Sequence, residues 1–165
     1  MKIDQRAERR PTDFEGFYES HYPRLTQALL LMTGHAHEAE DIAQEAMLRA
    51  LERWPRVRQM ESPLGYVYTT AFNLNRNRLR RASRRIRGLR HHDDQDVAER
   101  VTARDEAVEA LRSLTAAQRE ALLLVEWAGL TPDEAADVLG VEPTSVRTRL
   151  HRARAAIQRE VMKSE

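Results

Sequence analysis

The segment 131–154 contains helix start and stop signals so close together that it permits few folds. Thr131 and Glu134 have the spacing of a capping box, in which each side chain bonds to the backbone of the other residue. Gly140 tolerates the left-handed backbone conformation at which a helix ends. Pro143 suits the first turn of the next helix. The spacing predicts a helix-turn-helix, a unit whose second helix usually enters the major groove of DNA.

Charge separates the two helices of this predicted unit. Residues 143–159 contain five arginines and no acidic residue, whereas residues 131–142 contain four acidic residues and no basic one. Apolar residues recur with helical spacing at Val146, Leu150 and Ala153, which leaves the arginines on the outer side. A helix that is merely solvated usually mixes its charges. The pattern therefore favours DNA binding, and the alternative is a solvated face on an ordinary helical hairpin.

Composition favours an all-α chain. The 165 residues include six glycines and six prolines, show no alternating apolar pattern, and are 32% charged. Start and stop signals predict a first helix that ends at Gly34 and a loop at 55–61. The predicted helices are 12–33, 37–54, 62–85 and 105–129, the last with a restart at Thr115.

The chain reverses its charge between the third and fourth of these helices. Residues 76–92 contain eight arginines and no acidic residue, and residues 93–109 contain seven acidic residues and two arginines. Such an abrupt change marks a linker rather than a core segment. We therefore expect two small helical domains, at 12–85 and 105–162, joined by a flexible charged linker at 86–104.

The predicted helix 62–85 has one polar face that suits nucleic acid. Its expected inward stripe consists of Leu64, Val67, Tyr68, Ala71 and Leu74. Its other face combines an aromatic ring, hydroxyls, amides and guanidinium groups: Tyr66, Thr69, Thr70, Asn73, Arg76, Asn77 and Arg80. Amides and hydroxyls can read base edges, arginines can hold phosphates, and a tyrosine can stack on an unpaired base. The alternative is that Tyr66 is half-buried and the arginines only solvate the helix.

The predicted helix 37–54 is different, because its polar face is largely acidic. This face consists of Glu38, Asp41, Gln44, Glu45 and Arg49. An acidic surface does not suit DNA, but it suits the docking of a basic protein. The alternative here is again a solvated face.

Enzymes and metal-binding proteins are poorly supported as classes. The chain has no cysteine, no nucleophile–base pair and no phosphate-binding glycine loop. His35 and His37, like residues 91–94, lack further ligands at a suitable spacing. We therefore expect no catalysis, no metal and no cofactor. The N-terminus lacks an apolar signal core, and no apolar run approaches the roughly 20 residues that span a bilayer, so we expect a cytoplasmic protein without membrane insertion.

Three segments of the chain resemble the extracytoplasmic-function class of bacterial sigma-70 factors. The core-polymerase-binding motif of this class is matched by EAEDIAQEAMLRALERW (38–54), and its minus-10 reading helix by SPLGYVYTTAFNLNRNRLRR (62–81). Its minus-35 reading domain is matched by residues 114–157, where V-R-x-R-L-x-R-A-R (146–154) is the most specific part. The resemblance implies binding to core RNA polymerase and to promoter DNA. It also implies that an anti-sigma factor can hold such a protein inactive.

The resemblance assigns roles by position. Contacts with the clamp helices of the largest polymerase subunit are implied for Asp41, Gln44, Glu45 and Arg49. Capture of unpaired minus-10 bases is implied for the loop 55–61 and for Tyr66, Asn73, Arg76, Asn77 and Arg80. Contacts in the minus-35 major groove are implied for Arg147, Thr148, His151 and Arg152, with Arg149 and Arg154 near phosphates. The apolar helix 116–127 is implied to contact the flap of the second-largest subunit.

Two positions depart from the pattern of the class. Tyr66 stands where many members carry tryptophan, and Pro143 stands where an acidic residue is frequent. No further C-terminal domain follows, so we expect no appended sensor. The main alternative function is a stand-alone helix-turn-helix repressor or activator, with residues 1–85 as a sensor or dimerisation domain. That alternative does not explain the second nucleic-acid face at 62–85.

Overall fold

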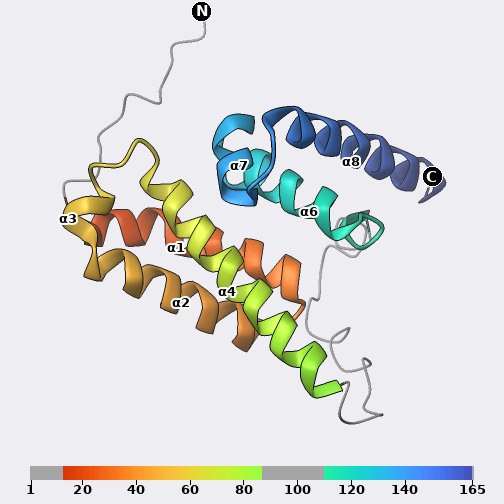
Figure 1. Ribbon diagram of the computed structural model, residues 1–165. Coiled ribbons are helices and arrows are strands. Elements are labelled where there is room, and N and C mark those ends of the chain that lie inside the picture. Colours follow the sequence, from red (N-terminus) through yellow and green to blue (C-terminus); the bar gives the residue numbers. More distant parts are fainter. Residues whose placement is uncertain (1–12, 87–109, 165) are drawn as a thin grey trace, which may run out of the picture.

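The computed structural model describes residues 13–86 and 110–164 (Figure 1). All regular elements within these two ranges are helical, as predicted. The first range contains α1 (Phe14–Thr33), α2 (Ala36–Glu52), α3 (Trp54–Val57) and α4 (Pro63–Ile86). The second contains α6 (Ala116–Leu122), the π-helix η2 (Leu123–Trp127), α7 (Pro132–Leu139) and α8 (Pro143–Ser164). The helix start expected at residue 105 and nearly all of the expected linker 86–104 lie outside the described residues.

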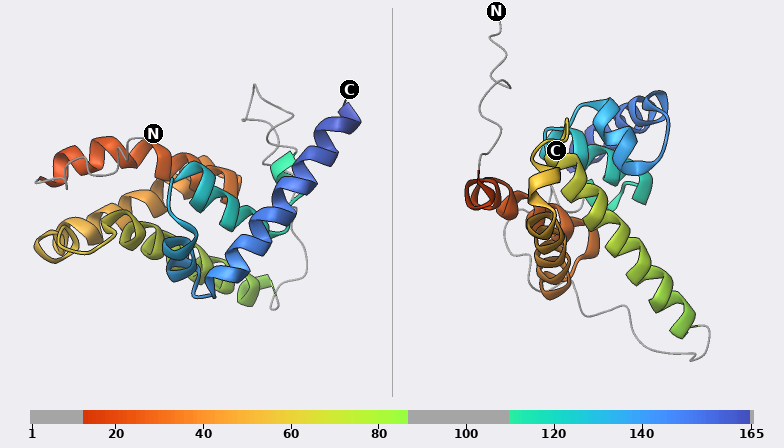
Figure 2. Two further views of the ribbon diagram at one scale, coloured as in Figure 1. Left: turned by 90° about the horizontal axis from the view of Figure 1, so that it is seen from above. Right: turned by 60° about the vertical axis from the view of Figure 1, so that its left-hand side comes forward.

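The first two helices lie side by side and are joined by a tight turn at Gly34 (Figure 2). Asp13 caps α1, since its carboxylate accepts a hydrogen bond of 3.2 Å from the Gly16 N–H. Gly34 ends α1 in the left-handed conformation, at φ 73°, and its N–H donates to the Leu30 carbonyl at 2.8 Å. The predicted end of the first helix is therefore confirmed.

The expected loop 55–61 begins instead with the short helix α3. The second helix ends at Glu52, and a new turn starts at Trp54 with a proline in its first turn, where a missing N–H costs little. Trp54 is buried and packs edge-on against Phe14 at a centroid distance of 5.4 Å. Burial of this indole and of Val57 explains why the segment is ordered as a helical turn.

The inward face of α4 is broader than predicted. Val67, Tyr68 and Ala71 are buried as expected, and the other two members of the predicted stripe are half-buried against the core. Phe72, which the stripe omitted, has no exposed surface at all. Its burial means that helices cover two sides of α4 rather than one.

The helix ends of the second range follow the predicted signals. Capping boxes form at Thr115 and at Thr131, where the Thr131 N–H donates to the Glu134 carboxylate at 2.7 Å. Gly140 ends α7 at φ 65°. The π-helix η2 was not predicted; its wider turn is closed by the Ala128 N–H, which donates to the Leu123 carbonyl at 2.8 Å.

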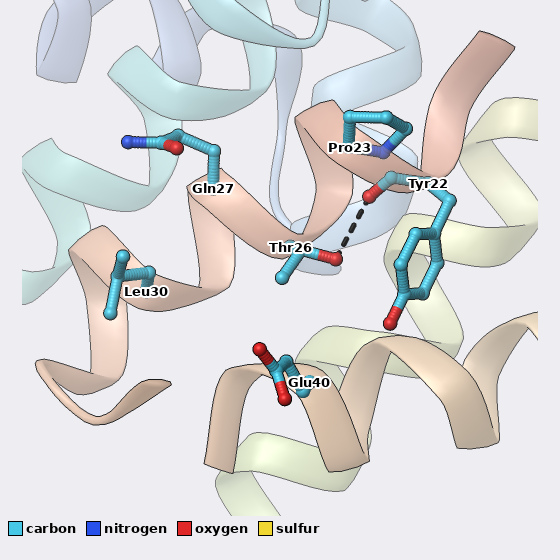
Figure 3. A pocket seen from close by; sticks show the side chains of 6 residues that line it. All are labelled: Tyr22, Pro23, Thr26, Gln27, Leu30 and Glu40. Carbon is cyan, nitrogen blue, oxygen red and sulfur yellow. Dashed lines mark hydrogen bonds between the residues drawn. The ribbon is translucent and has the colours of Figure 1, made fainter. Parts of the chain in front are cut away.

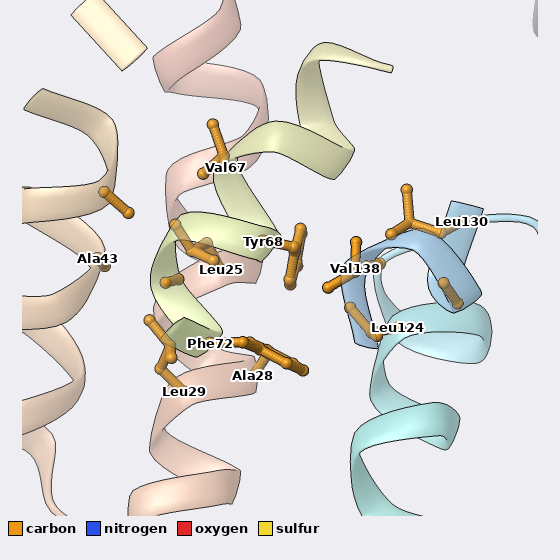
Figure 4. Close-up of a cluster of buried hydrophobic side chains, with 14 of the residues drawn as sticks. Leu25, Ala28, Leu29, Ala43, Val67, Tyr68, Phe72, Leu124, Leu130 and Val138 are labelled. Carbon is orange, nitrogen blue, oxygen red and sulfur yellow. The ribbon is translucent and has the colours of Figure 1, made fainter. Parts of the chain in front are cut away.

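The two ranges pack against each other. The fourth helix lies against α7, and α1 lies against α6 and η2. Buried side chains from both ranges form one cluster, in which Tyr68 and Phe72 of α4 lie beside Leu124 of η2 and Val138 of α7 (Figure 4). The charge pattern predicted the two helical groups but not this contact between them.

Candidate nucleic-acid interfaces

The polar face of α4 is partly exposed and partly covered. We call this the α4 face: Tyr66, Asn73, Arg76, Asn77 and Arg80. Asn73, Asn77 and Arg80 are exposed, whereas Tyr66 and Arg76 are half-buried. The hydroxyls of Thr69 and Thr70, expected to be available for bases, donate instead to carbonyls one turn earlier in the helix, at 2.8 and 2.9 Å.

Tyr66 of the α4 face borders a groove of about 630 Å³ between the two ranges. On one side lie Tyr66 and Thr69, together with Met60 and Glu61 from the segment expected to be a loop. The opposite side is supplied by the start and the acidic face of α7: Thr131, Asp133, Glu134, Asp137 and Val138. Carboxylates therefore line the space beside the residue expected to stack on an unpaired base.

The exposed face of α8 is basic from Arg147 to Arg154. We call this the α8 face: Arg147, Thr148, Arg149, His151, Arg152 and Arg154. All of these residues are exposed except Arg149, which is half-buried, while the apolar stripe of Val146, Leu150 and Ala153 is buried against the other helices. The helix-turn-helix packing predicted from the sequence is thus present.

The start of α8 adds two residues that the sequence analysis did not select. Thr144 and Ser145 line an open polar hollow of about 280 Å³ together with Thr148, Arg149 and Arg152. Their place in the first turn of a recognition helix was the available signal, since the N-terminal residues of such a helix contact base edges.

Two arginines of the α8 face form ion pairs with acidic residues of neighbouring helices. Arg147 pairs with Asp133 of α7 at 3.2 Å, and Arg154 pairs with Glu126 of η2. Both pairs are exposed to solvent, so they orient the guanidinium groups but contribute little to stability. Arg149 and Arg152 remain beside the hollow.

Glu120 of α6 lies near basic residues from both halves of the molecule, residues 13–86 and 110–164. Its carboxylate is 3.8 Å from the guanidinium group of Arg76. Burial raises the pKa of Glu120, and the charges of Arg76 and Arg149 oppose this rise. The carboxylate thus links a residue of the α4 face to the half of the molecule that carries the α8 face.

The polar face of α2 has an apolar component that was not predicted. We call the predicted residues the α2 face: Asp41, Gln44, Glu45 and Arg49. Arg49 donates to the Glu45 carboxylate at 2.8 Å, an exposed pair within one helix. Leu48 and Leu51 are 50% and 48% exposed on the same helix. Their departure from the buried alanine stripe was a signal visible in the sequence, and they make this surface amphipathic.

Other features of the described residues add no further site. A hollow of about 270 Å³ between α1 and α2 is lined by Tyr22, Leu30 and Glu40, among others, and by none of the predicted site residues (Figure 3). Within residues 13–86 and 110–164, no three histidines or carboxylates gather as a metal site requires. Residues 91–94, whose histidines and aspartates are unconvincing metal ligands on sequence grounds, lie outside these ranges. No described helix is long and apolar enough to cross a membrane.

Comparisons with known proteins match both parts of the chain. Residues 17–85 match the model of Sigma-70 region 2, and residues 104–157 match that of Sigma-70, region 4. RNA polymerase sigma factor YlaC of Bacillus subtilis (strain 168) is 29% identical over 161 residues, which cover 91% of this chain and 92% of the relative. ECF RNA polymerase sigma factor SigC of Mycobacterium tuberculosis (strain CDC 1551 / Oshkosh) is 32% identical over 125 residues, which cover 72% of this chain and 68% of the relative.

A solved structure has a similar fold. The sigma factor RpoE from Bartonella quintana, crystallised with the anti-sigma factor NepR, superposes with a TM-score of 0.75 at 20% sequence identity. The match covers 92% of this chain and 98% of that chain. Together with the helix-turn-helix, the basic α8 face and the polar α4 face, these matches lead to one family. The chain belongs to the sigma-70 family of RNA polymerase sigma factors, in its extracytoplasmic-function group.

Proposed function

We propose that the three faces divide the work of this sigma factor, which directs core RNA polymerase to promoters. The α8 face reads duplex DNA at minus-35, the α4 face holds the unpaired minus-10 strand, and the α2 face docks on the polymerase. The observation that carries this assignment is that one chain has two chemically different polar faces, one on α4 and one on α8. Arginines on a recognition helix suit a major groove, whereas a tyrosine among amides suits unpaired bases.

Within the α8 face, the base readers are the residues around the polar hollow. Thr144, Thr148 and Arg152 lie within the first three turns of α8, and the N-terminal part of such a helix enters the groove. Arg147 and Arg154 pair with carboxylates of other helices, so they are less free than Arg152 to turn toward base edges, and we assign them to phosphates. A stand-alone helix-turn-helix repressor or activator would need only the α8 face. The second polar face, on α4, therefore favours a sigma factor over that alternative.

The α2 face combines charge with exposed leucines. Asp41 and Glu45 can attract a basic partner, while Leu48 and Leu51 can be buried on contact. This combination suits the clamp helices of the largest polymerase subunit. We assign the contact with the flap of the second-largest subunit to α6 and η2, which support the helix-turn-helix from beneath.

The chain is proposed to act as a specificity subunit without catalytic activity or cofactor, in the cytoplasm, where polymerase and chromosome meet. Neither reading face needs high affinity alone, because the polymerase holds both faces on one promoter and so raises their effective concentration. An anti-sigma factor is proposed as a further partner; the similar RpoE of Bartonella quintana was crystallised with one.

Run-off transcription tests the function as a whole. Core polymerase with the purified chain, on a library of genomic promoters, should start transcripts from a defined subset that shares minus-35 and minus-10 sequences. Core polymerase alone is the control. A chain that binds core polymerase but starts no transcript from any promoter would contradict the proposal.

A core-binding assay tests the α2 face separately. The double variant Asp41→Ala/Glu45→Ala should bind core polymerase more weakly, because it removes the acidic attraction, and Leu48→Ser should do so by removing apolar contact. The matched control, Glu15→Ala/Glu19→Ala, removes the same two charges from exposed positions on α1. Equal affinities for the wild-type chain and both α2 variants would overturn this part of the assignment.

A further inference from the structure

One side of the α8 face carries ion pairs with other helices. Arg147 and Arg154 are about two helical turns apart, so they lie on the same side of α8. Each of them pairs with a carboxylate: Arg147 with Asp133 of α7 at 3.2 Å, and Arg154 with Glu126 of η2. We call this the paired side of the α8 face.

The other side of the α8 face borders the polar hollow at the start of the helix. Hydroxyl and guanidinium groups line this hollow, and none of its lining residues is acidic: Thr144, Ser145, Thr148, Arg149 and Arg152. We call this the open side. The two sides therefore differ in their charge balance, although arginines occur on both.

The stability of the fold does not account for both carboxylates of the paired side. Asp133 lies in the first turn of α7, where the helix dipole favours an acidic residue. Glu126, however, comes one residue before the end of η2, near the negative end of its helix, where the dipole disfavours a carboxylate. The side chains of Asp133 and Glu126 are 70% and 47% exposed, so their ion pairs stabilise the fold little. What the two residues share is an arginine of α8 as partner.

These ion pairs compete with contacts to DNA. Contacts between arginines and phosphates supply most of the affinity of a protein for DNA of any sequence. An arginine that is already paired must first leave its carboxylate, which then repels the phosphates as a like charge. In a helix-turn-helix the first helix, here α7, crosses the DNA backbone. Asp133, at the start of α7, therefore lies where it opposes binding to the backbone.

We propose that Asp133 and Glu126 are internal counterions of the α8 face, which weaken the binding of the free chain to DNA of any sequence. The open side keeps its groups for base contacts. The polymerase and the base sequence, rather than attraction to phosphates, then decide where the chain binds. This inference rests on the proposed function, because it takes the α8 face as the surface that binds duplex DNA. It adds two residues outside that face that set its affinity.

Fluorescence anisotropy of a labelled duplex of random sequence, titrated with the free full-length chain, measures the effect. Asp133→Asn keeps the shape of the side chain and removes its charge. It should tighten binding by about three- to eightfold in about 0.1 M salt, because one phosphate contact gains about eightfold between 1 M and 0.1 M salt. The slope of log K against log salt should become more negative by about 0.9.

Asp137→Asn is the matched control for this titration. It removes the same charge from an exposed position on α7 that borders the groove beside Tyr66 instead of an arginine of α8. It should change the affinity much less than Asp133→Asn and leave the slope unchanged. Unchanged affinity and slope in the double variant Asp133→Asn/Glu126→Gln would overturn the proposal.

A double-mutant cycle shows whether each carboxylate acts through its partner. Asp133→Asn should have little effect on DNA affinity in a chain that already carries Arg147→Ala. Glu126→Gln should likewise have little effect in the presence of Arg154→Ala. A weakened start of α7 would change the affinity equally with and without Arg147, so an equal effect in both backgrounds would contradict the role as a counterion.

Run-off transcription with competitor DNA separates this inference from the proposed function. The chain is mixed with duplex DNA of random sequence before core polymerase is added. Initiation by Asp133→Asn/Glu126→Gln should be inhibited at lower competitor concentrations than initiation by the wild-type chain, because more of the free variant is bound to the competitor. Equal inhibition of both proteins would contradict the internal counterions alone. Absence of initiation by the wild-type chain without competitor would contradict the proposed function.

Discussion

The arginines of the α8 face differ in their surroundings although they share one helix. Arg147 is drawn toward Asp133 at 3.2 Å, whereas Arg152 lines the polar hollow with Thr144 and Thr148. An arginine beside open polar space can turn two of its three guanidinium nitrogens toward the O6 and N7 atoms of guanine. The structure therefore favours Arg152 over Arg147 as a reader of bases.

Arg152→Ala should lower discrimination at minus-35 by about 1–3 kcal/mol, the value of one good bidentate contact. The measurement compares the affinity of the holoenzyme for a promoter and for the same promoter with a substituted minus-35 element. Arg159→Ala is the matched control, because it removes the same charge from α8 outside the hollow. Equal loss of discrimination in both variants would show that charge rather than contact is responsible.

His21 makes the stability of the first half depend on pH. Burial lowers the pKa of His21, the nearby charge of Arg24 lowers it further, and the ring packs on Phe17 at a centroid distance of 4.6 Å. In the unfolded chain the imidazole takes up its proton near its ordinary pKa of about 6.5, but in the folded chain only at lower pH. The unfolded state therefore binds more protons in this window, and stability falls as the pH drops below about 6.5.

Urea unfolding at pH 7 and pH 5 measures this effect. The wild-type chain should lose more stability between the two values than His21→Gln, which cannot titrate there. The variant is expected to be less stable at pH 7, since it loses the contact with Phe17, so only the difference between the two pH values is compared. The same loss in both proteins would contradict the role of His21.

Helix ends were predictable because their signals are local. The capping boxes at Thr115 and Thr131 each need only four consecutive residues, and both form as expected. Gly34 and Gly140 end their helices with positive φ for the same local reason. No other part of the molecule has to be known for these assignments.

Gly140→Ala tests the turn on which the helix-turn-helix depends. A Cβ at this position would meet no atom within 4 Å, so the expected cost comes from backbone strain at φ 65°. The loss of stability should be about 1–2 kcal/mol, measured by urea unfolding. Gly140→Asn is the control, because asparagine tolerates the left-handed conformation and should recover most of the loss. Full stability in Gly140→Ala would show that the turn can adopt another conformation.

Features that depend on distant partners were not predictable. Trp54 starts α3 because it packs on Phe14 of another helix, and η2 is stabilised within the packed C-terminal half. The candidate sites show the same limit. Periodicity placed the α2, α4 and α8 faces on their helices, but it could not show that Tyr66 borders a groove lined by carboxylates of α7.

At the scale of the molecule, the decisive feature is a core shared by two groups of helices. A helical apolar stripe shows that one side of α4 is buried, but not which partner covers it. Phe72 was therefore omitted from the predicted stripe, although the C-terminal half leaves it no exposed surface. A shared core can be distinguished from two independent domains by experiment. If the core is shared, a substitution that destabilises α7 should also destabilise α4.

Val138→Ala creates a cavity on the α7 side of this core, next to Tyr68 (Figure 4). It should cost about 1–3 kcal/mol, and amide hydrogen exchange of α4 should become faster, because α4 loses part of its cover. Val146→Ala is the matched control: it removes the same two methyl groups from a buried position on α8 and should mainly affect α7 and α8. Exchange rates in α4 that are identical in Val138→Ala and the wild-type chain would show that the halves are energetically independent.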